Sequence, residues 1–202
     1  MKILFVHTRS LTDVSEVLKK VDIKGKMGLV SSIQFLDQLK KAQKLLKNSI
    51  IIGQILGCNV KNAEKYKNKI DSFLFIGSGR FHPLYLAIKT KKSVYIANPD
   101  TNEFSRIEGS EVIDYERRLK GKLSKFYAAK SYGIIVSTKS GQYEMKKAES
   151  LRKKLKNSYV FICDNIDEGE FENFPGIDIW INTACPRIDG KNIINAEDLP
   201  RL

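Results

Sequence analysis

Cysteine is scarce in this sequence, and its spacing excludes two classes of protein. The chain has three cysteines in 202 residues, at Cys58, Cys163 and Cys185. An odd number of widely spaced cysteines does not form the disulfide framework of a small secreted domain. No Cys-x-x-Cys pair occurs, which excludes a zinc ribbon as a local motif.

Long apolar runs are also absent. No stretch approaches the roughly 20 apolar residues that span a bilayer. The short apolar run Ile3–Val6 near the start of the sequence is far too short for a signal peptide. No segment is low in complexity, and a hydrophobic fraction of 42% allows a packed core. We therefore expect a folded cytoplasmic protein with no membrane contact.

Acidic residues are fewer than basic ones. The sequence has 35 Lys and Arg and 23 Asp and Glu, which gives a net charge of +12. This excess is consistent with an acidic partner such as RNA or a ribosome-associated factor. It is also consistent with lysines on solvated helix faces, which is the interpretation that we favour. No basic run is interleaved with the stacking aromatics that single-strand binders use, so we do not expect a nucleic-acid partner.

Short β-branched runs alternate with helical, Lys-rich segments along the whole sequence. The predicted strands are Ile3–Val6, Gly28–Val30, Ile50–Ile52, Ser72–Ile76, Val94–Ile96, Gly133–Val136, Tyr159–Ile162 and Ile177–Ile181. The predicted helices are Ser15–Lys20, Ile33–Leu46, Leu84–Lys89, Tyr115–Ala129 and Tyr143–Leu155. This alternation is typical of a parallel sheet covered by helices.

The pattern predicts an α/β fold of two Rossmann-like units, each a small parallel sheet flanked by helices. A polar, turn-rich stretch at residues 98–110 separates the two sets of strands and is followed by a long predicted helix. We therefore expect one unit over residues 1–108 and a second over residues 109–202.

Polar or glycine-rich strings follow four of the predicted strands. They are GQILGC at 53–58, GSGRFHP at 77–83, STKSGQ at 137–142 and NTACPR at 182–187. Ligands of open parallel sheets bind at the carboxyl ends of the strands, so these loops are the candidate site.

Cys58 and Cys185 each sit just past a strand and next to a small residue, Gly57 or Ala184. A thiolate flanked there by backbone amides suits an iron–sulfur cluster. The alternative is that each cysteine is a small buried apolar residue. Their spacing matches no local metal motif.

The GSGRFHP loop is a candidate anion site, because a glycine-rich turn before a helix presents backbone amides. His82 stands where the dinucleotide fingerprint needs its last glycine, so the nucleotide signal is weak. Arg80 and His82 could meet an anion or could be surface turn residues. Gln54 and Gln142 follow strand ends and can both donate and accept hydrogen bonds.

The strings GQILGC, FIGSGRFHPLYLAI, GIIVSTKSGQ and INTACPRID, in this order and spacing, resemble the diphthamide synthesis family across nearly the whole chain. The resemblance implies three similar α/β domains, each offering one cysteine to a shared 4Fe-4S cluster that works with S-adenosylmethionine. It implies that a 3-amino-3-carboxypropyl radical is transferred to a histidine of elongation factor 2.

By motif, the resemblance assigns Cys58 to the second-domain ligand and Cys185 to the third-domain ligand. It places five further residues around the cluster and S-adenosylmethionine: Gln54, Arg80, His82, Gln142 and Arg187. Arg187 would bind the methionine carboxylate through its guanidinium. The alternative role for Arg187 is a salt bridge at a helix end or between domains.

The sequence begins at what resembles the family's second domain. We therefore expect a separate first-domain subunit, or a homologous subunit, to supply the third ligand, with Cys163 the only thiol in reserve. A second hypothesis is a non-catalytic accessory subunit that pairs with a complete homologue. A third is a nucleotide-binding regulatory module of Rossmann type, which the missing third glycine disfavours.

Overall fold

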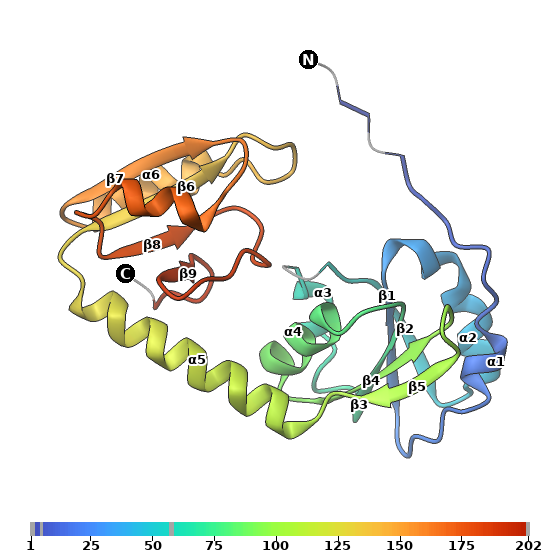
Figure 1. The fold of residues 1–202 in the computed structure, drawn as a ribbon. Coiled ribbons are helices and arrows are strands. Elements are labelled where there is room, and N and C mark those ends of the chain that lie inside the picture. The colour runs from blue at the N-terminus through green and yellow to red at the C-terminus, as the bar shows by residue number, and fades with distance from the viewer. Residues whose placement is uncertain (1–2, 5, 57–58, 201–202) are drawn as a thin grey trace. The chain divides into compact units, whose positions relative to one another are not determined.

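The computed structural model describes residues 3–4, 6–56 and 59–200, and it divides the chain into two compact units, residues 1–113 and 114–202. Each unit has its own sheet (Figure 1). The expected fold class, α/β with two mainly parallel sheets flanked by helices, is confirmed. The division falls inside a helix, between Ile113 and Asp114, rather than ahead of residue 109.

The unit 1 sheet has five strands in the spatial order β2-β1-β3-β4-β5. Their bounds are β1 Met27–Ser31, β2 Ser49–Gln54, β3 Ser72–Ile76, β4 Ser93–Asn98 and β5 Glu103–Arg106. The first four run parallel, and β5 pairs antiparallel with β4. All four parallel strands match predicted ones, whereas β5 was not predicted from the sequence.

Side chains of the unit 1 strands alternate between two buried clusters, one on each face of the sheet. On β1, Val30 joins the cluster with α3 (Lys61–Glu64) and α4 (Phe81–Thr90). Leu29 joins the other cluster, with α1 (Ser15–Leu18) and α2 (Leu39–Leu45). This alternation follows from the two-residue period of a strand. Helices therefore cover both faces, as the parallel pattern predicted.

A bulge at the end of β2 sets the position of its last residue. The β1–β2 register shifts after Leu29, so that Val30 lies opposite Gly53 and Ser31 opposite Gln54. Gly53 has φ +109°, a conformation that residues with a side chain rarely adopt. The glycine of the GQ pair therefore permits the bulge that brings Gln54 to the strand end.

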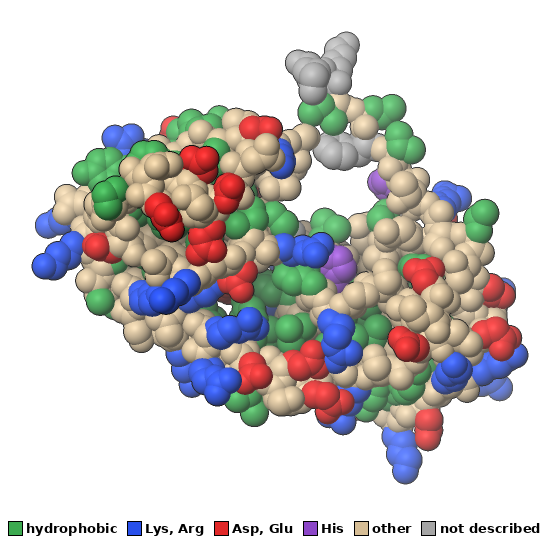
Figure 2. Space-filling view, in the orientation of Figure 1, with side chains coloured by type: hydrophobic (Ala, Val, Ile, Leu, Met, Phe, Trp, Pro, Cys, Tyr) green, Lys and Arg blue, Asp and Glu red, His purple; other side chains and the backbone are tan. Residues whose placement is uncertain are grey.

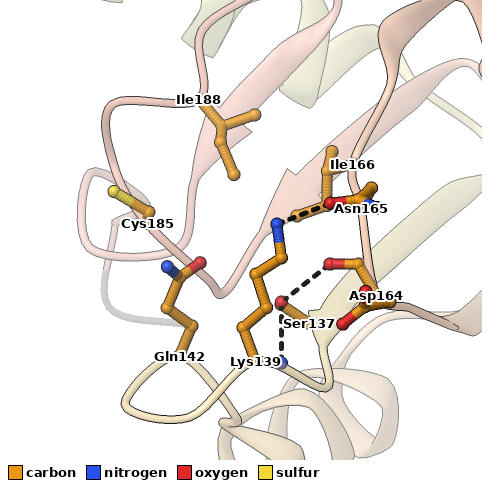
Figure 3. A pocket seen from close by; sticks show the side chains of 8 residues that line it. All are labelled: Ser137, Lys139, Gln142, Asp164, Asn165, Ile166, Cys185 and Ile188. Carbon is orange, nitrogen blue, oxygen red and sulfur yellow. Dashed lines mark hydrogen bonds between the residues drawn. The ribbon is translucent and has the colours of Figure 1, made fainter.

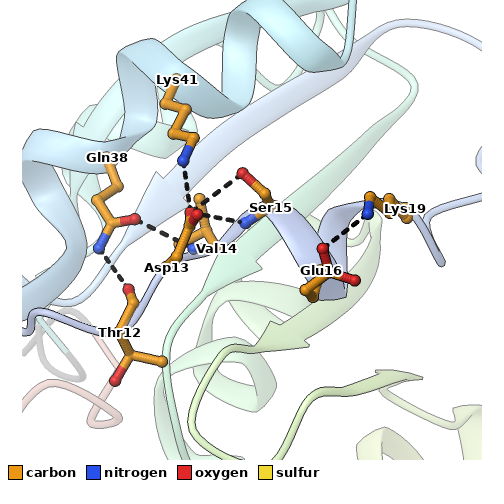
Figure 4. Close-up of polar contacts among 8 residues, drawn as sticks. All are labelled: Thr12, Asp13, Val14, Ser15, Glu16, Lys19, Gln38 and Lys41. Carbon is orange, nitrogen blue, oxygen red and sulfur yellow. Dashed lines mark hydrogen bonds and ion pairs between the residues drawn. The ribbon is translucent and has the colours of Figure 1, made fainter.

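The segment before α1 is fixed by a cluster of polar contacts (Figure 4). Asp13 Oδ1 accepts hydrogen bonds from Lys41 Nζ at 2.6 Å, from Ser15 N at 3.0 Å and from Ser15 Oγ at 3.1 Å. The Gln38 amide donates to Thr12 O at 2.7 Å and accepts from Val14 N at 3.2 Å. These bonds join the chain before α1 to Gln38 and Lys41, at the start of α2.

The contacts of Asp13 lower the pKa of its carboxyl from an ordinary 3.8 to about 2, mainly through Lys41 and then through the Ser15 amide. A lowered pKa means that the folded state binds this proton less readily than the unfolded state. Asp13 therefore stabilises the fold at neutral pH, and this contribution is lost as the pH falls from about 4 towards about 2.

We expect the carboxyl carbon of Asp13 to titrate with a midpoint near pH 2 in an NMR experiment. In Lys41→Met the midpoint should rise towards 3.8, because the largest of the interactions that favour the charged form is gone. Lys44→Met changes an exposed lysine of the same helix and is the control. An unchanged midpoint in Lys41→Met would mean that the lysine does not hold the carboxylate.

Two predictions for the beginning of unit 1 need correction. Ile3, Leu4 and Val6 form no strand in the described part of the chain, and their side chains are exposed. The predicted helix Ile33–Leu46 is two elements, a 3-10 helix η1 (Ile33–Gln38) followed by α2. Residues three apart lie on one face in both helix types, so the spacing of Ile33, Leu36 and Leu39 did not separate them.

The unit 2 sheet has four parallel strands in the spatial order β7-β6-β8-β9. Their bounds are β6 Tyr132–Ser137, β7 Ser158–Cys163, β8 Ile179–Asn182 and β9 Ile193–Asn195. The helices are α5 (Gly109–Ala128), which begins in unit 1, α6 (Met145–Lys154) and the 3-10 helix η2 (Glu168–Asn173). Three of these strands were predicted, β8 with a start two residues too early, and β9 was not.

The sole tryptophan of the sequence fills one face of the unit 2 sheet. Trp180 on β8 is 4% exposed, stacks on Phe171 of η2 with ring centroids 4.2 Å apart, and meets Phe161 of β7 edge-on. Gly133 of β6 lies opposite Trp180 in the ladder. A Cβ at Gly133 would come within 2.4 Å of Trp180 Cε3, so the glycine makes room for the indole.

Gly133→Ala is therefore expected to lower the free energy of unfolding of unit 2 by about 1–3 kcal/mol, the usual cost of overpacking a filled core. Urea denaturation followed by circular dichroism measures the change. Gly121→Ala in α5 is the control, because a Cβ there meets no atom within 4 Å outside the neighbouring backbone of its own helix, and it should not lower stability since Ala favours a helix over Gly. Equal stability of Gly133→Ala and the wild type would show that Trp180 can move aside freely.

Charges of both signs are mixed on the surface. Figure 2 shows blue Lys and Arg and red Asp and Glu side chains interspersed on the visible face. This mixture supports the interpretation that the lysines are solvated surface residues more than the interpretation of a single basic patch. Within the described ranges, no helix is both long enough and apolar enough to cross a membrane.

Candidate functional site

The carboxyl edge of the unit 1 sheet gathers three of the predicted site residues. Gln54 ends β2, and the GSGRFHP loop leaves β3 and enters α4, whose second residue is His82. The His82 ring is partly buried between Phe75 and Phe81, with ring centroids 6.0 and 5.7 Å away. Cys58 lies outside the described residues, so its role as a ligand stays a prediction.

Arg80, in the same loop, is held by Glu111 in the first turn of α5. Its Nε donates to Glu111 Oε2 at 3.0 Å, and its Nη2 donates to Glu111 Oε1 and to Arg106 O. Arg80 lowers the pKa of the Glu111 carboxyl, and Glu111 raises the pKa of Arg80. The guanidinium thus fastens the loop to the end of β5 and the start of α5. An anion bound there would have to replace Glu111.

The carboxyl edge of the unit 2 sheet contains a cavity of about 260 Å³ (Figure 3). It lies where the connection after β6 runs to β7 on one side of β6 and the connection after β7 crosses to β8 on the other side, the kind of place where open parallel sheets bind ligands. Loops after three strands line it with Ser137, Lys139, Gln142, Asp164, Asn165, Ile166, Cys185 and Ile188. Two predicted site residues, Cys185 and Gln142, therefore share one cavity.

The loop that carries Cys185 is fixed by a buried asparagine. Asn182 is 2% exposed, and its amide oxygen accepts from Ala184 N at 2.9 Å. Its amide nitrogen donates to Cys185 O and to Asn195 Oδ1, both at 2.9 Å. Beside it, Thr183 Oγ1 donates to Ile135 O at 2.7 Å. The NTAC string thus builds a rigid turn that presents the Cys185 side chain beside the cavity.

Cys163, the thiol in reserve, has a different environment. Its Sγ lies 3.9 Å from Val136 O, and its side chain packs with the apolar cluster around Trp180. Burial, and then the charge of Asp164, raise the pKa of the Cys163 thiol. A metal ligand must be a thiolate, so this environment disfavours ligation. Cys163 does not line the cavity.

Polar side chains make up most of the remaining cavity wall. Lys139 Nζ donates to Asn165 Oδ1 at 2.6 Å, and Thr138 Oγ1 donates to Asp164 Oδ1 at 3.0 Å. Ser137 Oγ accepts from Lys139 N at 3.2 Å. The bonds of Lys139 Nζ and Thr138 Oγ1 connect the loop after β6 to the loop after β7. Arg187, which was expected here, is exposed and is not part of the cavity wall.

The Cys185 thiol at this cavity has the chemistry needed to bind one iron atom of an iron–sulfur cluster. Iron–sulfur clusters are held by cysteine thiolates, and Cys185 is a partly exposed free thiol beside a cavity. Among the described residues, no group of three or more His, Cys, Asp or Glu could hold a metal ion. The described part of the chain thus presents one thiol at this cavity that could hold an iron atom of a cluster.

Asn182 and Lys139 lie in the candidate loops but were not singled out as site residues, and Asp164 lies outside those loops. Asn182 had a usable signal, because an asparagine directly after a buried strand often bonds the backbone of the next turn. Asp164 and Lys139 had no such signal. A charged residue after a strand end occurs on ordinary surface loops as often as at binding sites.

Comparison with known proteins gives a consistent result. A sequence model of the family described as "Putative diphthamide synthesis protein" matches residues 1–196. The 2-(3-amino-3-carboxypropyl)histidine synthase of Pyrococcus horikoshii is 33% identical, over 92% of this chain and 58% of the relative. The synthase of Methanocaldococcus jannaschii is 32% identical, over 88% of this chain and 50% of the relative.

A solved structure shares the fold. The crystal structure of Dph2 from Pyrococcus horikoshii with a 4Fe-4S cluster superposes with a TM-score of 0.79 at 29% identity. The match covers 94% of this chain and 62% of that one. The chain thus spans about half to three-fifths of the length of these relatives.

Proposed function

The chain belongs to the diphthamide synthesis protein family, and on that premise we propose that it forms part of a radical 3-amino-3-carboxypropyl transferase. The proposed substrates are S-adenosylmethionine and a histidine of elongation factor 2. The reaction is the first step of diphthamide biosynthesis, in the cytoplasm, and it uses a 4Fe-4S cluster.

The single observation that carries this proposal is the position of Cys185. The NTAC turn holds this thiol beside a polar cavity at the ligand-binding edge of a parallel sheet. We assign Cys185 and Cys58 as two cluster ligands. When bound, the cluster supplies the electron that cleaves a sulfur–carbon bond of S-adenosylmethionine.

The other predicted residues take supporting roles. Gln142 lines the Cys185 cavity and can bond the polar groups of a ligand there. Gln54 and His82, at the carboxyl edge of unit 1, are proposed contacts of the cofactors. Arg80 positions the loop that carries His82 through its paired bonds to Glu111. Arg187 is a proposed contact of S-adenosylmethionine outside this cavity.

The third thiolate is proposed to come from a polypeptide that covers the remaining length of the family. Two observations support this: Cys185 is the one described thiol that lines the cavity, and the chain covers 58% of the length of the Pyrococcus horikoshii relative. A homologous subunit could fill the same role. Cys163 is a poor substitute, because its thiol packs against the apolar cluster.

The test is anaerobic coexpression of this chain with a polypeptide that matches the rest of the family's length. We expect the complex to bind iron and sulfide, to cleave S-adenosylmethionine at the carboxypropyl carbon, and to add that group to the histidine of elongation factor 2. Mass spectrometry of elongation factor 2 measures the transfer, and the same mixture without the chain is the control.

Two outcomes would contradict parts of the proposal. Full transfer by the chain alone would remove the need for a second polypeptide and would make Cys163 the leading third ligand. A stable complex that transfers normally without any cysteine of this chain would support the accessory role instead.

A further inference from the structure

Two opposite charges line the unit 2 cavity from neighbouring strand ends. Lys139 follows β6 and Asp164 follows β7. In the ladder between these strands Ser137 lies opposite Cys163, so the two loops begin at the same level of the sheet. Figure 3 shows the Lys139 side chain extending between the loop of Cys185 and the loop of Asp164.

Neither charge neutralises the other. The Lys139 ammonium donates to the Asn165 amide oxygen at 2.6 Å and not to the Asp164 carboxylate. An ammonium has three N–H donors, so two remain for a ligand in the described surroundings. Asp164 accepts from Thr138 through Oδ1, and a carboxylate has a second oxygen and further lone pairs for a ligand cation.

A cation and an anion on one small cavity match the chemistry of an α-amino acid. The ligand carboxylate would bind the ammonium of Lys139, and the ligand ammonium would bind the carboxylate of Asp164, both as charge-assisted hydrogen bonds. Ile166 and Ile188 supply apolar wall for the carbon chain of the amino acid. A simple anion would leave Asp164 unused and repelled, and a simple cation would do the same to Lys139.

The size of the cavity points to part of a ligand. Small-molecule sites typically measure about 300–1,000 Å³, and this cavity measures about 260 Å³. It can therefore take the amino-acid end of a larger molecule, while the rest of that molecule lies outside it.

We infer that this cavity binds the α-amino-acid end of S-adenosylmethionine, with Lys139 on the carboxylate and Asp164 on the ammonium group. The inference rests on the proposed function for the identity of the ligand. It assigns the carboxylate to Lys139 in place of Arg187, because Lys139 lines the cavity and Arg187 does not. Asn165 is then a positioning residue, since its bond holds the Lys139 ammonium over the cavity.

The test uses the full chain without its cluster and three small probes. L-Methionine has both charges, methioninol lacks the carboxylate, and 4-(methylthio)butanoate lacks the amino group. Backbone amide shifts in a ¹⁵N-labelled sample report binding even when it is weak. We expect methionine to perturb the amides of residues 137–142 and 164–166, and each single-charge probe to bind about tenfold or more weakly.

Variants assign each charge to its partner. Lys139→Met should weaken methionine binding about tenfold or more, and should leave methioninol binding unchanged because that probe has no carboxylate. Asp164→Asn should weaken methionine but not 4-(methylthio)butanoate. Lys153→Met removes an exposed lysine of α6, outside the cavity, and should bind all three probes like the wild type.

Three results would overturn the inference. They are the absence of shifts at these amides with saturating methionine, equal binding of methionine and methioninol by the wild type, and unchanged methionine binding in Lys139→Met. The experiment needs neither iron nor enzymatic turnover. Failure of the proposed function would appear instead as loss of cluster binding or of carboxypropyl transfer, with the methionine shifts intact.

Discussion

Cys185→Ala is expected to remove most of the iron from the anaerobically reconstituted complex, together with its broad visible absorption. A 4Fe-4S cluster is held by cysteine thiolates, and Cys185 is the described thiol that lines a cavity at the ligand-binding edge. Loss of one thiolate ligand leaves an iron atom exposed to water and oxygen. Cys58→Ala is expected to have the same effect, because the family motif assigns it the second-domain ligand.

Cys163→Ala is the matched control. It removes the same atom from the same unit, but the Cys163 thiol packs against apolar side chains and lies 3.9 Å from Val136 O. Iron and sulfide content and the visible spectrum should match those of the wild type. If Cys163→Ala loses iron while Cys185→Ala keeps it, the two thiols have been assigned the wrong way round.

Asn182→Ala is expected to destabilise unit 2 and to release the loop of Cys185. The substitution removes three hydrogen bonds of a side chain that is 2% exposed. It leaves Ala184 N and the Asn195 amide oxygen without this partner. A buried polar group that loses its partner costs about 1–3 kcal/mol, so the total should reach about 2–4 kcal/mol.

Urea unfolding followed by Trp180 fluorescence measures this effect, because Trp180 is the sole tryptophan and lies in unit 2. The control is Asn173→Ala in η2, an exposed asparagine that bonds Glu170. It should change stability by no more than about 0.5 kcal/mol. The same midpoint for both variants would mean that water replaces the bonds of Asn182 without cost.

The elements that could be predicted from the sequence are those whose pattern follows from burial. β3 is the clearest case, since all five residues of Ser72–Ile76 are buried and the run was predicted with its observed bounds. β5 could not be predicted, because Glu103–Arg106 is mostly exposed and reads as a polar turn. Its place depends on antiparallel pairing with the preceding strand β4 and on Phe104 stacking on Tyr95, neither of which its own polar residues indicate.

Part of the candidate site could be predicted in the same way. Cys185 was marked because it follows a strand end, Gln142 was added by the family resemblance, and the topology brings both to one cavity. The partner of Arg80 could not be predicted, since Glu111 lies 31 residues away in another element. That Lys139 and Asp164 line the same cavity could not be predicted either. Their loops lie together because β6 and β7 are neighbouring parallel strands.

Each hydrophobic cluster of the described residues belongs to one unit, with Leu29 and Phe73 on one side of the division and Ile134 and Trp180 on the other. Two separate cores are free to melt at different temperatures, so the chain should not behave as a single cooperative system. Calorimetry should then give a van't Hoff enthalpy below the calorimetric one. The fluorescence transition, which reports only on Trp180, should not coincide with the transition seen by far-ultraviolet circular dichroism.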